Sequence, residues 1–263
     1  MSEKYFQLDG RCVTNLTKHK VYSKSRKYFE LDEDRVKNIS IDKIYDNYKK
    51  FLNIDPKLSN ERFGKEISEI KQKLQNNQDH KNILNGISIP FILPKNDQDD
   101  IGENLQKIYL PALKKSFSHV FSNYEFINHC KQDLKNKIKL WNNTRNEKIL
   151  KKLKSEDVVG LLFPCLNEFS FPAAIETLNN LPDCFLLAGA YEVIASLIGY
   201  PALLRRDKGY PPLLWFSSLR NSENSNISYH LEPYGYNLTF NKRAHLNLAA
   251  EYWWHSLVVV KQK

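Results

Sequence analysis

The residue best placed to act as a nucleophile is Cys165, which follows the apolar run Val158–Phe163 and precedes a helical pattern. Many α/β enzymes carry a nucleophile at such a strand-to-helix junction. However, Pro164 removes one backbone donor that an oxyanion hole could use, and the nearest downstream histidine is His230. We therefore interpret Cys165 as a small buried residue, with a catalytic thiol as the alternative. Ser217 lacks the Gly-x-Ser-x-Gly context of a serine hydrolase.

A second group of reactive side chains follows, in which three histidines and two glutamates occur within 26 residues. If the last part of this group is helical, Glu251 and His255 lie on the same face of the helix. That arrangement suits a metal pair or an ordinary hydrogen bond. His245 would then point elsewhere, so a third ligand would have to come from His230 or Glu232 on a strand. The spacing favours structural histidines, and we predict no metal and no cofactor.

The strongest signal for binding is a lysine-rich segment, Lys131–Lys154, with nine basic and two acidic residues. It ends an N-terminal part in which 31 Lys and Arg meet 20 carboxylates, a formal charge of +11. Apolar residues recur in it every three or four positions, which predicts an amphipathic basic helix over Glu125–Lys154. Such a helix suits an acidic protein, nucleic acid or an anionic membrane surface, and a solvated face without a partner is the alternative. The partner-binding residues predicted in this segment are Lys131, Lys135, Lys139, Lys148 and Lys152.

The C-terminal part is rich in aromatic residues and includes the adjacent pair Trp253 and Trp254. Two neighbouring tryptophans cannot both face inward on one helix. Because tryptophan is a common anchor of protein interfaces, we predict that at least one of them lies at a partner-binding surface.

Hydrophobic periodicity predicts an α+β fold that positions these residues. Residues 1–154 form a basic, mostly helical region with a short β-hairpin in Lys4–Leu31 and an extended stretch at Ile87–Pro94. Residues 155–263 form an apolar, aromatic-rich α+β domain with a small, mainly antiparallel sheet packed by helices. The predicted helices are Ile41–Leu52, Phe63–Leu74, Asp99–Phe121, Glu125–Lys154, Phe171–Leu181, Phe185–Ile198 and Lys242–Trp254. The predicted C-terminal strands are Val158–Phe163, Pro212–Leu219, Ile227–Glu232 and Asn237–Phe240.

The composition, 41% hydrophobic over 263 residues, provides enough apolar surface for a core without covalent staples. The four cysteines are never closer than 19 residues apart, which indicates reduced thiols and no zinc or redox motif. Met1–Gly10 lacks the apolar stretch of a signal peptide. The run Phe185–Leu204 contains Glu192 and predicts a buried helix, not a transmembrane segment. We therefore expect a cytoplasmic protein.

These patterns favour a non-enzymatic protein-protein interaction or scaffold module, a component of a larger assembly. It would dock on the acidic surface of another protein through the basic helix and the aromatic C-terminal surface. A nucleic-acid-binding protein is one alternative. Its binding would be nonspecific, because the chain has few arginines and no base-reading motif. A cysteine- or metal-dependent hydrolase is the other.

Overall fold

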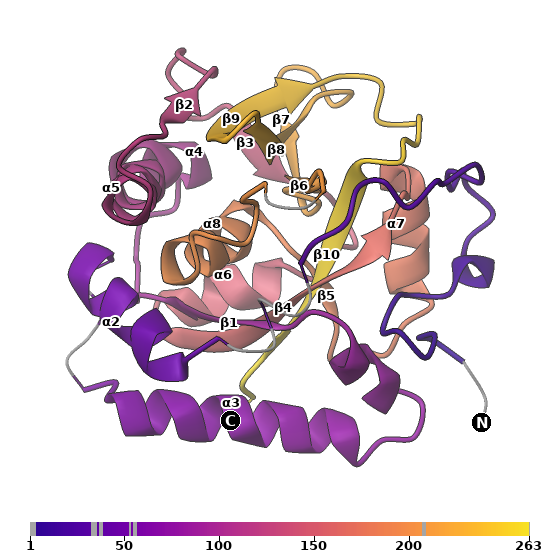
Figure 1. Cartoon of the computed structure of the whole chain (residues 1–263), viewed down its shortest axis with the longest axis horizontal. Helices are drawn as coiled ribbons and strands as arrows, with labels where there is room; N and C mark the ends of the chain where they lie inside the picture. The colour runs from indigo at the N-terminus through magenta and orange to yellow at the C-terminus, as the bar shows by residue number, and fades with distance from the viewer. Residues whose placement is uncertain are drawn as a thin grey trace.

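The computed structural model of this chain describes residues 4–32, 36, 39–52, 54, 57–206 and 209–262. An eight-stranded mixed sheet forms its centre, with helices around it and two further short strands that pair separately (Figure 1). The predicted α+β class is therefore confirmed. The described α-helices are α2 (Ile41–Phe51), α3 (Asn60–Gln75), α4 (Ile101–Asn104), α5 (Leu110–Val120), α6 (Glu147–Leu153), α7 (Phe171–Asn179) and α8 (Ala190–Gly199). The described strands are β1 (Ile89–Leu93), β2 (Phe126–Asn128), β3 (Ile138–Leu140), β4 (Val158–Asn167), β5 (Leu186–Leu187), β6 (Leu213–Trp215), β7 (Leu219–Asn221), β8 (Ser228–Tyr234), β9 (Asn237–Arg243) and β10 (Trp253–Val260).

The strand order of the large sheet is β1-β4-β10-β6-β8-β9-β2, and the short β5 also pairs with β10. β4 pairs antiparallel with β1 and β10, whereas β10 pairs parallel with β6 and β2 pairs parallel with β9. The sheet is thus larger and more mixed than the small antiparallel one predicted. All ten residues of β4 are buried. A strand covered on both faces has a continuous apolar sequence, and that signal predicted Val158–Phe163.

The two amphipathic helices predicted in the N-terminal part are confirmed as α2 and α3. Each begins after a serine whose hydroxyl accepts a hydrogen bond from the backbone of the first turn. Ser40 accepts from the amide of Lys43, and Ser59 accepts from the amide of Arg62. Because these caps and the apolar stripes are local in sequence, they are visible without the rest of the fold.

The helix predicted for Phe185–Ile198 is confirmed from Ala190 onward as α8, whereas Leu186–Leu187 forms the strand β5. α8 is buried along its whole length against β1, α2 and α5. Its first turn contains Glu192, whose carboxylate accepts hydrogen bonds from the Gly189 amide at 2.7 Å and from the Asn146 side chain at 3.0 Å. Burial raises the pKa of Glu192. Across the described residues, no helix combines the length and the apolar character needed to cross a membrane.

The continuous helix predicted for Glu125–Lys154 is wrong. This stretch forms β2, a loop, β3 and the short helix α6. The backbone angle φ is 60° at Asn136 and 61° at both Asn143 and Arg145, a conformation that an α-helix does not contain. The apolar positions nevertheless face inward, and Leu134 is fully buried. A spacing of three to four residues therefore indicated burial correctly and secondary structure incorrectly.

The helix predicted for Lys242–Trp254 is also wrong. β9 extends to Arg243, a loop follows, and Trp253 begins β10 at the centre of the sheet. The aromatic and β-branched sequence of β10 suits a strand that is buried on both faces. The hairpin of β8 and β9 agrees with the predicted strands, and Gly235 in its turn has a φ of 63°.

The β-hairpin predicted in Lys4–Leu31 is absent as a pair of strands among the residues that the structure describes. Single backbone bridges connect this segment to itself and to the later part of the chain: Phe6 with Cys12, Val21 with Phe169, and Phe29 with Tyr210. The main hydrophobic core draws on both sides of the predicted boundary between residues 154 and 155, and includes Leu153 and Val158. The composition of the chain therefore changes at that boundary, but the hydrophobic core is continuous across it.

Candidate functional site

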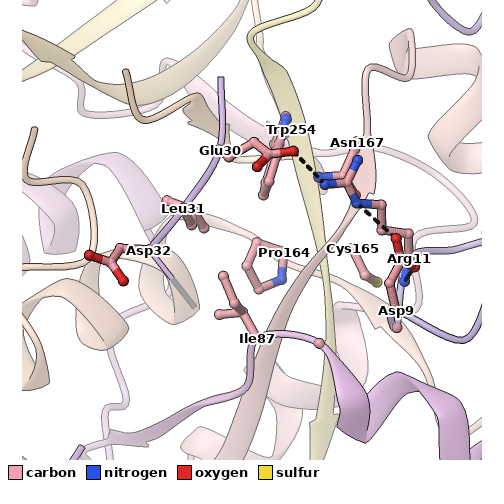
Figure 2. Close-up of a pocket in the computed structure, with 12 residues that line it drawn as sticks. Asp9, Arg11, Glu30, Leu31, Asp32, Ile87, Pro164, Cys165, Asn167 and Trp254 are labelled. Carbon is pink, nitrogen blue, oxygen red and sulfur yellow. Dashed lines mark hydrogen bonds and ion pairs between the residues drawn. The ribbon is translucent and has the colours of Figure 1, made fainter. Parts of the chain in front are cut away.

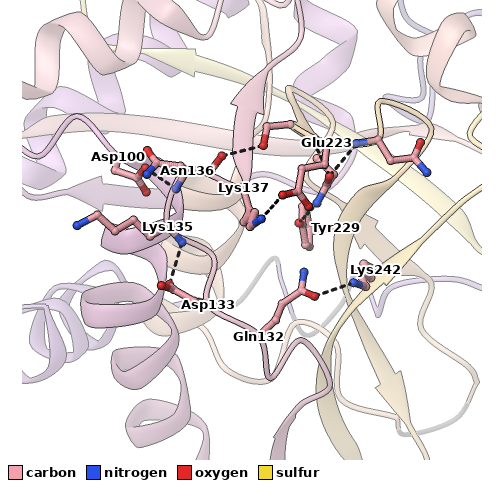
Figure 3. A network of polar contacts seen from close by, with 12 residues as sticks. Asp100, Gln132, Asp133, Lys135, Asn136, Lys137, Glu223, Tyr229 and Lys242 are labelled. Carbon is pink, nitrogen blue, oxygen red and sulfur yellow. Dashed lines mark hydrogen bonds and ion pairs between the residues drawn. The ribbon is translucent and has the colours of Figure 1, made fainter.

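The loop of the lysine-rich segment is held by side chains of neighbouring elements (Figure 3). Asp100, the N-cap residue of α4, accepts a hydrogen bond from the amide of Asn136 at 2.7 Å. The Gln106 side chain accepts one from the amide of Leu134 at 2.8 Å. These contacts satisfy backbone groups that a helix would have paired internally, so the loop follows a fixed, non-helical path.

Part of the positive charge of this segment is neutralised by acidic residues. Within the part of the chain that the structure describes, ion pairs join Lys135 to Glu103 at 3.3 Å, Lys137 to Glu223 (Figure 3), and Lys154 to Asp99 at 2.5 Å. Lys131 and Lys139 are exposed, and no ion pair involves them in the described part of the chain. The predicted lysines therefore do not share one helical face: Lys131, Lys135 and Lys139 lie on the loop and β3, whereas Lys148 and Lys152 lie on α6.

Lys148 and Lys152 line a cavity of 420 Å³, and a second cavity of 300 Å³ adjoins it. Both cavities are lined by Cys184 and by residues 260–262 at the end of β10, so they adjoin, and the two together are named here the α6 groove. β10 runs down to α3 at this end of the molecule (Figure 1), where Lys73 donates a hydrogen bond to the Gln262 side chain at 2.8 Å. The groove thus lies between α6, α3 and the end of β10.

Trp253 and Trp254 are both buried, although Trp254 also lines a cavity, so their role in partner binding stays a prediction. They occupy a strand and not a helix, and adjacent strand residues point to opposite faces of the sheet. Trp254 packs in the main core, and Trp253 packs on the other face in a second cluster with Trp215 and Phe171. Both faces of β10 are covered, which removes the need to expose either indole. Neither residue forms an exposed aromatic anchor.

Cys165 lies inside β4 and is 6% exposed. Burial raises the pKa of its thiol to about 12. A nucleophilic cysteine needs the opposite environment, one that stabilises the thiolate. The surroundings of Cys165 therefore favour the interpretation of a core residue over that of a catalytic thiol.

In the native protein, iodoacetamide at about pH 8 is expected to label Cys184 first and to leave Cys165 unlabelled. Cys184 is only partly buried, whereas the Cys165 thiol is enclosed and roughly one part in ten thousand ionised at that pH. Mass spectrometry of tryptic peptides measures both rates, and labelling in denaturant provides the control in which all four cysteines react. Rapid native labelling of Cys165 would restore the catalytic interpretation.

The predicted histidine and glutamate group does not converge. His230 and Glu232 lie together on β8, with the His230 Nε2 atom 3.4 Å from the Glu232 carboxylate. His245 is exposed in the loop after β9, and Glu251 accepts hydrogen bonds from backbone amides of the N-terminal segment. His255 lies on β10. Among the described residues, no three His, Cys, Asp or Glu side chains are placed to hold a metal ion.

The structure instead contains a serine–histidine pair that sequence spacing did not suggest. The Nδ1 atom of His255 lies 2.9 Å from the Ser217 hydroxyl, and its Nε2 atom lies 2.9 Å from the carbonyl oxygen of Phe169. The carbonyl can only accept, so Nε2 donates and Nδ1 accepts from the hydroxyl. Both side chains are fully buried, and burial lowers the pKa of His255 to about 3. The pair has the residue types of a hydrolase site but no access for a substrate, so it is structural.

A different cavity, of 280 Å³, lies at the end of β4 and is named here the Asn167 cavity (Figure 2). A bulge forms its floor: the pairing of β4 with β10 shifts register between His255 and Leu257, opposite Pro164. Past the bulge, Asn167 pairs directly with Trp254 on β10, so their side chains project from the same face. The bulge thus explains how a proline is tolerated in a central strand and turns this face toward the cavity.

The walls of the Asn167 cavity come from three segments remote in sequence: the turn Asp9–Arg11, the stretch Glu30–Asp32, and Gly86 with Ile87. Gly10 has a φ of 87°, and a Cβ atom there would lie 2.4 Å from the Gly86 nitrogen. Only glycine allows the turn to pack this closely. The turn carries Arg11 to the mouth of the cavity.

Among the residues that the structure describes, Arg11 is the one basic residue that lines this cavity. Its guanidinium lies 3.0 Å from the Glu30 carboxylate and 3.4 Å from that of Asp9 (Figure 2). It also lies over the Trp254 ring, 5.8 Å from the ring centroid. Carboxylates and an indole therefore already surround one organic cation at this position.

Two residues that line the Asn167 cavity carry buried polar side-chain atoms without hydrogen-bond partners. Asn167 is 9% exposed and neither its amide nitrogen nor its oxygen is paired, and the indole N–H of Trp254, 5% exposed, is also unpaired. An unsatisfied buried polar group costs about 1–3 kcal/mol. Sequence reasoning missed this site because Asn167, Arg11 and Glu30 belong to no local motif and meet only in the fold.

No protein-family model, curated protein or solved structure matches this chain. The α6 groove and the Asn167 cavity are therefore the features of the molecule that bear on its function.

Proposed function

We propose that the protein is a non-enzymatic interaction module that binds an acidic segment of another protein in the α6 groove, as a component of a larger assembly. The observation that carries this proposal is the position of α6, which places the C-terminal half of the lysine-rich segment along a groove with an apolar floor. The cytoplasmic location expected from the sequence belongs to the same proposal.

The charges and the floor of the groove define the occupant. Five lysines line it against three carboxylates: Lys73, Lys148, Lys151, Lys152 and Lys261 against Glu69, Glu156 and Asp183. The floor presents Cys184 and the aliphatic side chains of Leu186 and Val260. An acidic segment with one or two apolar side chains complements both features, because charge sets orientation and rate of association while apolar burial provides affinity.

Nonspecific nucleic-acid binding receives less support from this geometry. Such binding needs a row of mobile cations that follow a phosphate backbone. Here the Lys152 ammonium donates to the carbonyl oxygen of Lys261 at 2.5 Å, and Lys261 itself contacts Glu69. The hydrolase alternative has the buried Cys165 and His255 as its candidate residues. Protein binding is therefore the function that we propose.

Reversing two charges of the groove in the double variant Lys148→Glu/Lys151→Glu is expected to weaken partner binding about tenfold or more, because both lysines line the groove. The matched control is Lys131→Glu/Lys139→Glu, which makes the same charge change on the loop and β3. Partners purified with each tagged variant from the source cells are compared by quantitative mass spectrometry. Each partner that only the groove variant loses is then titrated in purified form.

Such a partner must also protect Cys184 from iodoacetamide in the wild-type protein, because Cys184 lines the groove. Equal loss of partners from both double variants would contradict the groove as the binding site. Loss of all binding after nuclease treatment would favour the nucleic-acid alternative. Thermal unfolding of both variants checks that neither substitution acts through misfolding.

A further inference from the structure

Another cavity, of 420 Å³, lies between the end of α2, residues 94–96 after β1, and residues 107–115 at the start of α5, and is named here the Lys115 cavity. α2 and α5 pack against each other on one side of the molecule (Figure 1), and the side chains of Lys50 and His119 join their ends at 3.0 Å. Among the residues that the structure describes, this cavity shares none with the α6 groove or the Asn167 cavity. Its volume falls within the usual range of ligand pockets, about 300–1,000 Å³.

A turn of π-helix forms one wall of the Lys115 cavity. In Leu105–Tyr109 the backbone is wider than an α-helix, and the amide of Leu110 donates to the carbonyl of Leu105, five residues earlier. Pro111 follows in the first turn of α5. A proline lacks the N–H group and crowds the carbonyl four residues before it, and the wider turn lets the chain continue as a helix. Such turns often occur at functional sites, and this one contributes Ile108 to the cavity.

The first argument for a ligand is positive charge that the protein does not neutralise. Lys95, Lys107 and Lys115 line the cavity, and among the described residues no carboxylate does. Lys107 is paired with Glu103 of α4 at 2.5 Å. Lys95 and Lys115 are exposed, and in the described part of the chain neither ammonium group has an ion pair or a hydrogen bond. Asp157 accepts from the backbone amide of Lys95 at 2.6 Å. Two unpaired ammonium groups at one cavity attract an anion.

The second argument is the apolar surface beside these lysines. The side chain of Ile108 is 42% exposed although it is large and aliphatic. Phe51, Pro94 and Pro111 also line the cavity, and none of the three is fully buried. A fully hydrated inorganic anion would leave this surface in water, and a neutral apolar molecule would gain nothing from the lysines. Apolar contact provides affinity and charged groups fix orientation, so a ligand with both features fits best.

We propose that the Lys115 cavity binds a small amphipathic organic anion, in which an acid group is joined to an aliphatic or aromatic body. The acid group lies between the ammonium groups of Lys95 and Lys115, and the body covers Ile108 and Phe51. This proposal stands independently of protein binding at the α6 groove.

The probe is octanoate, and two comparisons each remove one of its features. Octanamide keeps the chain without the charge, and acetate keeps the charge without the chain. ¹H–¹³C spectra of the full chain follow the δ1-methyl signal of Ile108, which is identified by its absence from Ile108→Val. We expect this signal to shift with octanoate at concentrations up to about 10 mM, and both comparisons to bind at least about tenfold more weakly. Equal binding of either comparison overturns the proposal, as do octanoate shifts that spare Ile108.

Two double variants test the lysines. Lys95→Gln/Lys115→Gln is expected to weaken octanoate binding at least about tenfold, because each ammonium group makes a charge-assisted contact. The matched control, Lys49→Gln/Lys114→Gln, removes exposed lysines of α2 and α5 that do not line the cavity, and should change the affinity by less than about twofold. All four side chains are exposed, so the midpoint of thermal unfolding should stay the same. Equal weakening by both variants would mean that the basic surface as a whole attracts the anion. That result, or an unchanged affinity of the first variant, contradicts the proposal.

Discussion

Replacing Gly102 with alanine is expected to lower the free energy of unfolding by about 3 kcal/mol or more. Gly102 lies in α4 against the loop of the lysine-rich segment, and a Cβ atom there would lie 1.9 Å from the carbonyl oxygen of Leu134. That carbonyl cannot move aside cheaply, since the Leu134 side chain is fully buried and its amide is bonded to Gln106. The clash therefore outweighs the preference of a helix for alanine.

The sign of this effect distinguishes the observed loop from the helix that periodicity predicts. Without the loop carbonyl, alanine at a helical glycine would stabilise the protein by up to about 1 kcal/mol. Gly64 in α3 is the matched control, because the nearest atom to an added Cβ there is 4.0 Å away. Urea unfolding followed by circular dichroism should show stabilisation of about 0.5–1 kcal/mol for Gly64→Ala. A Gly102→Ala protein as stable as the wild type would contradict the described path of the loop.

The lysine-rich segment shows why local pattern was insufficient here. Its apolar residues fall three or four apart, and a loop that returns repeatedly to the core produces the same spacing as a helix. The hydrogen bonds that decide between the two come from Asp100 and Gln106, about thirty residues earlier in the chain. A usable signal was present, because asparagine at positions 136 and 143 tolerates the positive φ that interrupts a helix.

The helix predicted near the end of the chain is wrong for a different reason. Lys242–Trp254 has no helical stripe, and the following run of Trp, Leu and Val residues is typical of a strand buried on both faces. In such a strand the adjacent tryptophans point to opposite covered faces, so both can be buried. α2 and α3 were predictable because their caps and stripes are local.

The candidate sites could be predicted from sequence only in part. The lysines of α6 are visible in the sequence as part of a basic segment, but their groove requires the ends of β10 and α3 beside them. The Asn167 cavity depends on a β-bulge and on a turn around Gly10, and neither feature leaves a motif that joins residues 9–11 to residue 167. Contacts of this range follow from topology and not from composition.

Acidification is expected to destabilise the protein through His255. Its pKa is near 6.5 in the unfolded chain and about 3 in the fold, where burial disfavours the charged form. The unfolded state therefore binds a proton first, so stability is complete above about pH 6.5 and is lost as the pH falls, by up to about 1.4 kcal/mol per unit. By about pH 4.5 the loss from this residue amounts to about 3 kcal/mol. Its ring faces Phe171 and Trp215, and neither carries a charge that would offset the loss.

Other groups titrate in the same range, so the measurement has to isolate His255. The pKa of buried His230 is also lowered, which adds to the loss, whereas the pKa of Glu192 is raised by burial and acts in the opposite direction. Both contributions are shared by wild type and His255→Gln, and cancel in the difference between their stabilities. Urea unfolding from about pH 7.5 to about pH 4.5 should show the variant about 1–3 kcal/mol less stable at the upper end and the gap closing with acid. His19→Gln, a change at an exposed histidine, should follow the wild type throughout. A gap that is the same at both pH values would mean that His255 is protonated equally in the folded and unfolded chains, which its enclosure by Ser217 and the Phe169 carbonyl does not allow.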